Sequence, residues 1–175
     1  MVSFRGFSEV ESSIPLDLVV VSAFEGMAGM DASNAFLGRA GIGEFYGRVG
    51  PLLSSHTDQF VEMLPELGQD DPSTAARTAL IWYRVVPGGQ ADFERALEAT
   101  AVPYEVATGV SSQTGRFLLG DGWHYLRFLG LPSLGAYQSY LDGLAGAEGY
   151  DDLAAIVAAT REVILRPVPS LFVRE

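Results

Sequence analysis

The order of strand-like and helix-like segments in the second half of the chain leaves few folds open. Ala79–Val86 is rich in β-branched and aromatic residues and ends at Pro87-Gly88-Gly89, which predicts a strand followed by a turn. A helix is predicted next, and Pro103 is expected to end it. Its apolar positions recur at helical spacing, at Phe93, Ala96, Leu97 and Thr100.

A hairpin and two further helices are predicted after Pro103. Val106–Leu119 and Trp123–Leu129 read as strands joined by the turn Gly120-Asp121-Gly122. An amphipathic helix begins after Pro132-Ser133, and a second helical stretch covers Asp151–Leu165. Pro167 and Pro169 are expected to stop this stretch, and Ser170–Arg174 reads as a final strand.

The resulting order over residues 79–175 is β-α-β-β-α-β. This order is the split βαβ arrangement of the ferredoxin-like fold, an α+β fold with an antiparallel sheet and helices on its outer face. We therefore predict that residues 79–175 form one complete ferredoxin-like repeat.

The first half of the chain echoes the second at a shift of 104 positions. The shift places Phe36-Leu37 on Tyr140-Leu141 and Phe24 on Phe128 without a gap. We interpret residues 1–67 as a partial repeat of the order β-β-α-β, and residues 68–78 as a linker. The expected elements of this partial repeat are strands at Val2–Val10 and Leu16–Phe24, a helical region over 33–55, and a strand at Phe60–Leu64.

Composition excludes several classes of function. The net charge is −11, from 22 acidic residues against 11 basic ones, all of them arginine, which argues against binding to nucleic acids or anionic membranes. Cysteine is absent, which excludes disulfides, zinc–thiolate sites, iron–sulfur clusters and thiol nucleophiles. The only two histidines, His56 and His124, lie 68 positions apart, so no metal site is predicted. The longest N-terminal apolar stretch, Leu18–Phe24, is too short to span a bilayer, and a cytoplasmic protein is the expectation.

From residue 79 onward the sequence resembles the dimeric α+β-barrel superfamily. The residues that carry the resemblance are Arg84-Val85-Val86-Pro87-Gly88, the pair Asp92-Phe93, and the hairpin from Gly109 to Leu126. The hairpin is similar to that of aromatic polyketide cyclases of the tetracenomycin type. In outline it is also similar to that of cofactor-independent antibiotic-biosynthesis monooxygenases and spore-pigment cluster proteins. The resemblance implies a small-molecule enzyme that needs no cofactor.

One position departs from the cyclase pattern. Those cyclases carry a histidine inside the second hairpin strand, where this chain has Tyr125, and His124 is displaced by one residue. A displacement of one residue turns a side chain to the other face of a sheet. The cyclases also tend to have His and Asp after the first helix, where this chain has Ala101-Val102. A cyclase mechanism cannot be transferred intact.

Strand alternation predicts one aromatic and arginine-lined cavity on the sheet face away from the helices. Ile81, Val85, Phe117, Leu126 and Phe128 are expected to pack on the helices. The cavity is expected to hold Leu80, Trp82, Arg84, Ser112, Thr114, Arg116, Trp123, Tyr125 and Arg127. The candidate catalytic residues are Tyr125 and Arg127 within it, and His124, which alternation places on the helix side at the start of the strand. Trp82, Arg84, Ser112, Arg116 and Trp123 are the candidate substrate-binding residues, because indoles and guanidinium forks suit an aromatic anion.

Structural roles compete with each of these assignments. Strand arginines often pair with a neighbouring glutamate, and strand tryptophans usually pack. His124 is a general base, a haem ligand or a structural residue at a strand edge. Tyr125 is a proton donor or a packing residue.

Two classes of function follow. The first is a cofactor-independent tailoring enzyme that cyclises or oxygenates an enolate or phenolate of an aromatic polyketide, a small hydrophobic substrate that can be anionic. The second is a non-catalytic binding or accessory protein of a biosynthetic pathway, and haem binding through His124 ranks below both. A single ferredoxin-like sheet leaves one face uncovered, so we expect a homodimer or an intrachain pseudo-dimer.

Overall fold

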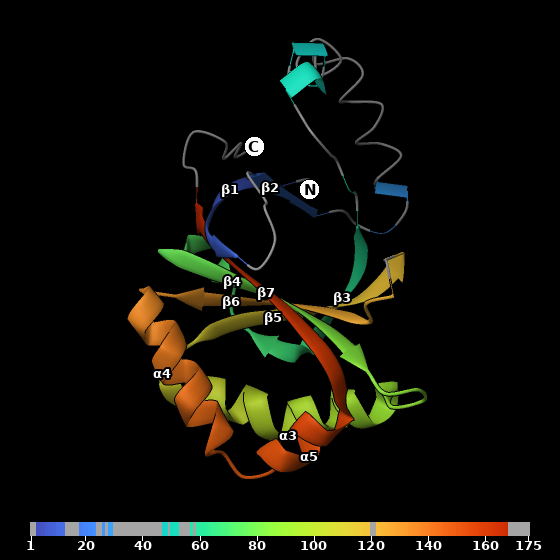
Figure 1. Cartoon of the computed structure of the whole chain (residues 1–175), viewed down its shortest axis with the longest axis vertical. Helices are drawn as coiled ribbons and strands as arrows, with labels where there is room; N and C mark the ends of the chain where they lie inside the picture. The colour runs from blue at the N-terminus through green and yellow to red at the C-terminus, as the bar shows by residue number, and fades with distance from the viewer. Residues whose placement is uncertain are drawn as a thin grey trace. The chain divides into compact units, whose positions relative to one another are not determined.

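A computed structural model describes residues 3–12, 18–23, 26, 28–29, 47–48, 50–52, 57, 59–119 and 122–167 (Figure 1). The chain divides into two compact units, each of which is described by itself. The smaller unit comprises residues 1–6, 20–58 and 168–175, and it contains the 3-10 turn η1 (Gly50–Leu52). The larger unit comprises residues 7–19 and 59–167.

The larger unit contains the elements on which the candidate site is built. They are β3 (Phe60–Gln69), η2 (Pro72–Thr74), β4 (Arg77–Val85), α3 (Gln90–Thr108), β5 (Ser111–Leu119), β6 (Tyr125–Leu131), α4 (Leu134–Ala145), α5 (Tyr150–Ile156) and β7 (Val157–Pro167). Two N-terminal strands, β1 (Ser3–Ser12) and β2 (Leu18–Ala23), precede them.

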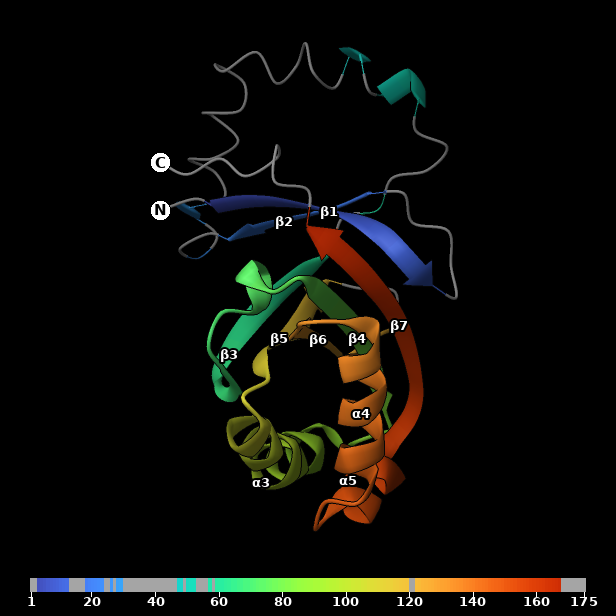
Figure 2. The same cartoon turned by 90° about the vertical axis from the view of Figure 1, so that its left-hand side faces the viewer.

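The strands form one sheet in the order β2-β1-β7-β4-β6-β5-β3. Within it, β7-β4-β6-β5 is the ferredoxin-like order, and all three of its strand pairs are antiparallel. Helices α3, α4 and α5 lie on one side of these strands (Figures 1 and 2). The predicted α+β, ferredoxin-like fold is confirmed.

The edges of this sheet are extended by strands from the first half of the chain. β3 pairs with β5, from Phe60–Leu119 to Gln69–Ser112, and so runs five residues beyond the strand predicted at Phe60–Leu64. β1 pairs with β7 from Phe7–Pro167 to Ser12–Val163. The internal repeat stays a prediction, because most of its expected helical region over 33–55 lies outside the described residues.

Two predicted helix boundaries are wrong. Helix α3 contains Pro103 and ends only at Thr108, where Gly109 adopts a left-handed conformation (φ 70°) and donates its backbone N–H to the carbonyl of Glu105. The helix predicted over Asp151–Leu165 is helical only to Ile156. Residues Val157–Pro167 instead form β7, because they pair along the whole of β4. The strand predicted at Ser170–Arg174 lies outside the described residues.

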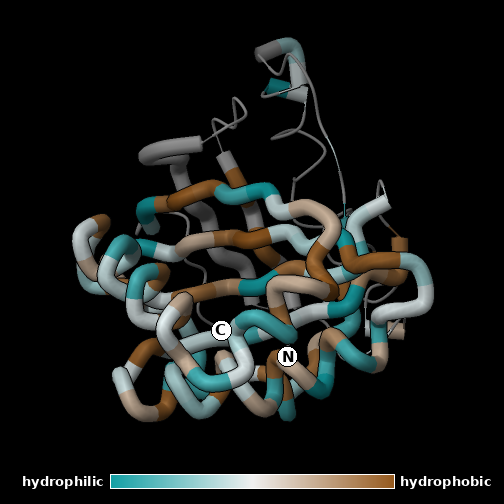
Figure 3. The backbone as a smooth tube through the Cα atoms, turned by 60° about the horizontal axis from the view of Figure 1, so that its bottom comes forward, coloured by the Kyte–Doolittle hydropathy of each residue, from teal (hydrophilic) through white to brown (hydrophobic). Residues whose placement is uncertain are grey.

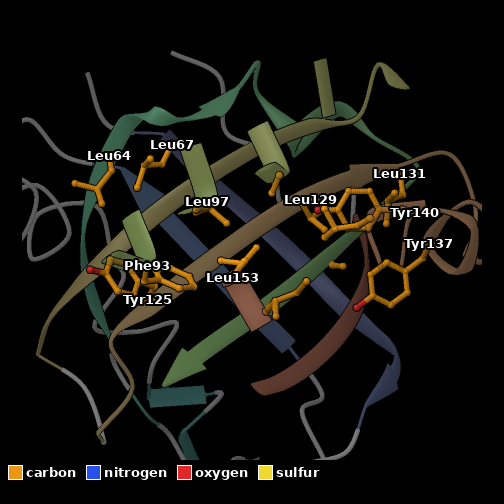
Figure 4. Close-up of a cluster of buried hydrophobic side chains, with 14 of the residues drawn as sticks. Leu64, Leu67, Phe93, Leu97, Tyr125, Leu129, Leu131, Tyr137, Tyr140 and Leu153 are labelled. Carbon is orange, nitrogen blue, oxygen red and sulfur yellow. The ribbon is translucent and has the colours of Figure 1, made fainter. Parts of the chain in front are cut away.

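The main hydrophobic core lies between the sheet and the helices (Figure 4). Phe93 and Leu97 of α3 and Leu153 of α5 pack against Leu129 and Tyr125 of β6. Hydrophobic and hydrophilic residues alternate along the helices, as expected for elements with one buried face (Figure 3). Every residue of β6 is buried, which makes this strand the centre of the unit.

Within the described residues, no helix is long and apolar enough to cross a membrane.

Candidate functional site

Strand register decides which side chains share a face of the sheet, because residues directly opposite one another project to the same side. Ile81 of β4 lies opposite Arg127 of β6 and Glu162 of β7. Ile81 belongs to the core packed on the helices, so this side is called the helix face. Trp82 lies opposite Leu126 and Arg161 and projects to the other side, called the opposite face.

The predicted cavity set divides between these two faces. The prediction for β4 is confirmed, because Trp82 and Arg84 project to the opposite face, and Trp123 contacts Arg84 there. The prediction for the hairpin is wrong, because its polar residues project to the helix face, where most bond to α3. These residues are Ser112, Thr114, Arg116, Tyr125 and Arg127. Leu126 and Phe128, predicted to pack on the helices, lie on the opposite face.

A fully buried carboxylate, Glu105, organises the helix face. Its Oε2 atom accepts hydrogen bonds from Arg127 Nη2 at 2.5 Å and from the Ser112 hydroxyl at 2.6 Å. Its Oε1 atom accepts a hydrogen bond from the Tyr140 hydroxyl at 2.7 Å. These four residues are called the Glu105 cluster. Three donors, one of which is a cation, offset the cost of burying this carboxylate.

Arg127 has donor capacity that the cluster does not use. Its side chain is 1% exposed, and only Nη2 bonds to Glu105. The Nε and Nη1 atoms are buried, and neither has a hydrogen-bond partner among the described residues. Buried N–H groups without acceptors are costly and rare in proteins, and they often mark a place where a ligand or water binds. Arg127 therefore offers two N–H donors to an acceptor in the sheet–helix layer.

Two more groups on the helix face lie beside the Glu105 cluster. Burial raises the pKa of the Tyr83 phenol to about 12; nearby Arg127 opposes this rise, and Glu162 and Glu105 add to it. Tyr83 is therefore a neutral hydroxyl at physiological pH. Glu162 on β7 is partly exposed and accepts a hydrogen bond from the Tyr137 hydroxyl at 2.7 Å. It supplies a carboxylate that is not paired with a cation among the described residues.

Tyr125 and Arg116 meet α3 at a different carboxylate. The Tyr125 hydroxyl donates to Glu94 at 2.6 Å, and Arg116 bridges Glu94 at 3.3 Å and Glu62 at 2.8 Å. Burial, with the bond to Glu94, raises the pKa of Tyr125 above the ordinary value for tyrosine. Both residues have protein partners, in line with the packing and ion-pair alternatives.

His124 bonds to the backbone of the neighbouring strand. Its Nδ1 atom accepts a hydrogen bond from the backbone N–H of Val85 at 3.0 Å. The backbone N–H of His124 donates to the carbonyl of Tyr83. A neutral imidazole that accepts at Nδ1 carries its proton on Nε2. Neither nitrogen then has a free lone pair for a base or for an axial haem ligand. The residue fits the structural role at a strand edge.

On the opposite face, two arginines stack on two indoles. The Arg84 guanidinium lies 5.1 Å from the ring centroid of Trp123. The Arg161 guanidinium lies 5.8 Å from the same ring and 5.6 Å from the Trp82 ring. These four residues are called the indole–guanidinium stack.

Sequence reasoning missed four of the residues that define these two sites. Glu105, Tyr83, Glu162 and Arg161 carry no local motif. Alternation in β4 offers a signal for Tyr83 alone, since it shares the face of Ile81. Among the described residues, no three His, Asp or Glu side chains gather as a metal site would require.

Comparison with solved structures identifies the architecture. A candidate monooxygenase from Lactobacillus acidophilus NCFM superimposes with a TM-score of 0.61 at 12% identity, covering 94% of this chain and 77% of that one. An anthrone oxidase-like protein gives 0.58 at 15% identity, covering 95% and 76%. A dimeric chlorite dismutase from Nitrobacter winogradskyi gives 0.50 at 11% identity, covering 95% and 99%. These similarities show the fold, which is of the ferredoxin-like α+β-barrel type.

The resemblance noted from the sequence is thus confirmed at the level of fold. No protein-family model and no curated protein matches the sequence. Activity in this α+β-barrel chain must therefore be argued from its own side chains. The helix face carries two free donor nitrogens of Arg127, the neutral phenol of Tyr83 and the half-buried carboxylate of Glu162. Among the described residues, we therefore take this group as the candidate for catalysis.

Proposed function

We propose that this chain is an enzyme that oxygenates an enolisable aromatic substrate, using molecular oxygen and no metal or organic cofactor. The observation that carries the proposal is the pair of unsatisfied N–H donors on the buried Arg127. A carbonyl oxygen placed against Nη1 would accept a hydrogen bond from it, and its developing negative charge on enolisation would be stabilised in a site of low dielectric. Glu105 holds Arg127 in place and does not itself contact substrate.

The neighbouring residues supply the other parts of the reaction. Glu162 accepts the proton from the substrate CH₂ carbon, and the neutral Tyr83 hydroxyl gives a further donor to the enolate oxygen. Oxygen then adds to the carbanion to give a peroxide anion, which takes back the proton from Glu162 and becomes a hydroperoxide. The hydroperoxide loses water, which carries away the second hydrogen of the carbon. One oxygen atom ends as the new carbonyl and the other as water, so the carbon loses the four electrons that oxygen gains.

Two of the similar structures support this chemistry over cyclisation. One is a candidate monooxygenase and the other is an anthrone oxidase-like protein. Cyclisation and oxygenation start from the same enolate. We therefore propose that the substrate is an aromatic poly-ketone with an activated CH₂ group, of the kind made in polyketide biosynthesis.

The test compares wild type with Arg127→Lys on anthrone. Lysine keeps the positive charge beside Glu105 but lacks the two free donors, so kcat/KM for oxygen uptake and anthraquinone formation should fall roughly 100-fold. Arg95→Lys is the matched control, because Arg95 is exposed and pairs with Asp92 on the surface of α3. Tyr83→Phe is a second variant, expected to lower kcat without loss of thermal stability. Wild-type oxygen uptake no faster than autoxidation, or an Arg127→Lys variant as active as wild type, would exclude the proposal.

We also propose that the active form is a homodimer. One of the similar structures is described as dimeric. Sedimentation velocity should give twice the monomer mass of 18.8 kDa at micromolar concentration. A concentration-independent monomer would favour closure within one chain.

A further inference from the structure

The arginines of the indole–guanidinium stack lack the partners that arginines in an acidic protein ordinarily find. The chain holds twice as many acidic as basic residues, yet no carboxylate of the described residues lies within salt-bridge distance of Arg84 or Arg161. Arg84 is exposed and Arg161 is partly exposed, so ligands in solution can reach both. Two adjacent cations that have no counterion in the part of the chain that the structure describes indicate a place for an anion from outside the chain.

The stacking geometry leaves the binding groups of both arginines free. A guanidinium over an indole uses its flat face for the cation–π contact. Its N–H donors lie in the guanidinium plane and stay available for the two oxygens of a carboxylate. Both guanidinium groups lie within 6 Å of the Trp123 ring centroid, so their donors surround one aromatic platform.

The second indole of the stack, Trp82, is held in place by the sheet. Trp82 is 5% exposed, and its indole N–H donates to the side-chain oxygen of Gln59 at 2.9 Å. Arg161 lies directly opposite Trp82 in the β4–β7 ladder. Side chains held by packing before a ligand arrives lose less entropy on binding.

We propose that Arg84 and Arg161, both beside the Trp123 ring, bind the carboxylate of a small aromatic acid. This site lies on the opposite face of the sheet from Arg127 and does not rest on the proposed oxygenation. The carboxylate engages the guanidinium forks, and the ring of the acid lies against the exposed part of Trp123. A non-aromatic dicarboxylate binds more weakly, because it lacks the ring contact.

Intrinsic fluorescence offers a direct measurement, because the chain has only two tryptophans and both belong to the stack. Titration of wild type with phthalate, excited at 295 nm, should give a saturable change, with a Kd that rises with salt concentration. Malonate should give a Kd at least tenfold higher. Isothermal titration calorimetry with the same two ligands checks that quenching reports binding.

The variants locate the site. Arg161→Gln and Arg84→Gln should each raise the Kd for phthalate at least tenfold, and Arg161→Lys should fall between Arg161→Gln and wild type. Arg166→Gln is the matched control, because Arg166 is exposed on the same strand but five positions along, on the other side of it. It removes the same charge and should leave the Kd within twofold.

Three results of the titrations would overturn the proposal. They are a titration that does not saturate, equal loss of binding in Arg166→Gln, and phosphate binding as tightly as phthalate, which would show general anion attraction only. Sedimentation of each variant is run in parallel. If Arg84→Gln alters the oligomeric state and leaves phthalate binding unchanged, these arginines serve contact with a second copy, and the proposal is wrong.

Discussion

Glu105 orders the side chains around it on the helix face and has no free oxygen of its own. Both of its carboxylate oxygens are occupied, by Arg127 and Ser112 on one side and by Tyr140 on the other. With both oxygens occupied by residues of the chain, the carboxylate has no free oxygen to offer a substrate. Its role is to fix the direction of the Arg127 guanidinium, so that the remaining N–H groups point away from it.

Replacement of Glu105 by glutamine should therefore act on stability. Glu105→Gln keeps the shape but leaves the Arg127 charge buried without a counter-charge, and we expect a loss of about 3–5 kcal/mol in the free energy of unfolding. Urea denaturation followed by circular dichroism measures this. Glu66→Gln on β3, an exposed position, should change the free energy of unfolding by less than about 0.5 kcal/mol. A loss below about 1 kcal/mol for Glu105→Gln would show that the ion pair is dispensable.

At the scale of elements, β6 explains why the site was only partly predictable. Alternation identifies the inner face of a strand only when the other face is exposed, but β6 is buried along its whole length on both faces. Polar residues were therefore assigned away from the helices. Arg127 and Tyr125 project toward them because Glu105 and Glu94 on α3 supply partners, and a pairing between residues 22 or 31 positions apart leaves no local signal.

The boundary between α5 and β7, at Ile156 and Val157, also could not be predicted from local sequence alone. The order of elements was predictable because strand-like and helix-like patterns in residues 79–145 are long and regular. Residues Ala154–Thr160 are mostly alanine and β-branched, and both structures accommodate them. Backbone hydrogen bonds to β4 stabilise the strand conformation of the residues from Val157 onward. Pro103 does not end α3, because tertiary contacts stabilise the turn that follows it. One of these contacts is the ion pair between Glu105, in the last turn of α3, and Arg127.

The contact between β6 and η2 gives a prediction at this scale. A Cβ on Gly130 would lie 2.9 Å from the Cα of Pro72 and would meet the Ser111 hydroxyl. Gly130→Ala should therefore push η2 off the sheet and lower the free energy of unfolding by about 1–3 kcal/mol. Gly135→Ala on α4 is the contrasting control, because a Cβ there meets nothing closer than 3.8 Å, and alanine favours a helix. Thermal melts should move in opposite directions, and a Gly130→Ala variant as stable as wild type would contradict the contact.

For the whole molecule, the absence of lysine and cysteine makes its alkaline titration unusually simple. Tyrosine is the only side chain that loses a proton between pH 9 and 12, since arginine stays charged. Burial raises the pKa of Tyr83 to about 12, and burial together with bonds to Glu94, Glu162 and Glu105 raises those of Tyr125, Tyr137 and Tyr140.

Alkaline unfolding should therefore follow these phenols. The unfolded chain loses tyrosine protons near pH 10 and the folded chain does not, so their full stabilisation is present below pH 10. It falls as pH rises toward 12, by roughly 1.4 kcal/mol per pH unit for each phenol involved. Urea midpoints at pH 8, 10 and 11, with tyrosinate absorbance at 295 nm, measure this. Constant stability to pH 11.5 would contradict the raised pKa values.

Strand β7 makes the two sites interdependent in a way that point substitutions would not show. Arg161 and Glu162 are neighbours in sequence, and one serves the indole–guanidinium stack while the other serves the helix face. Loss or gain of a single residue before them would exchange their faces. A carboxylate would then stand beside Trp82, and a second cation beside Arg127. Substitutions in β7 would alter one of these two groups at a time. Insertions and deletions within β7 would disrupt both groups together.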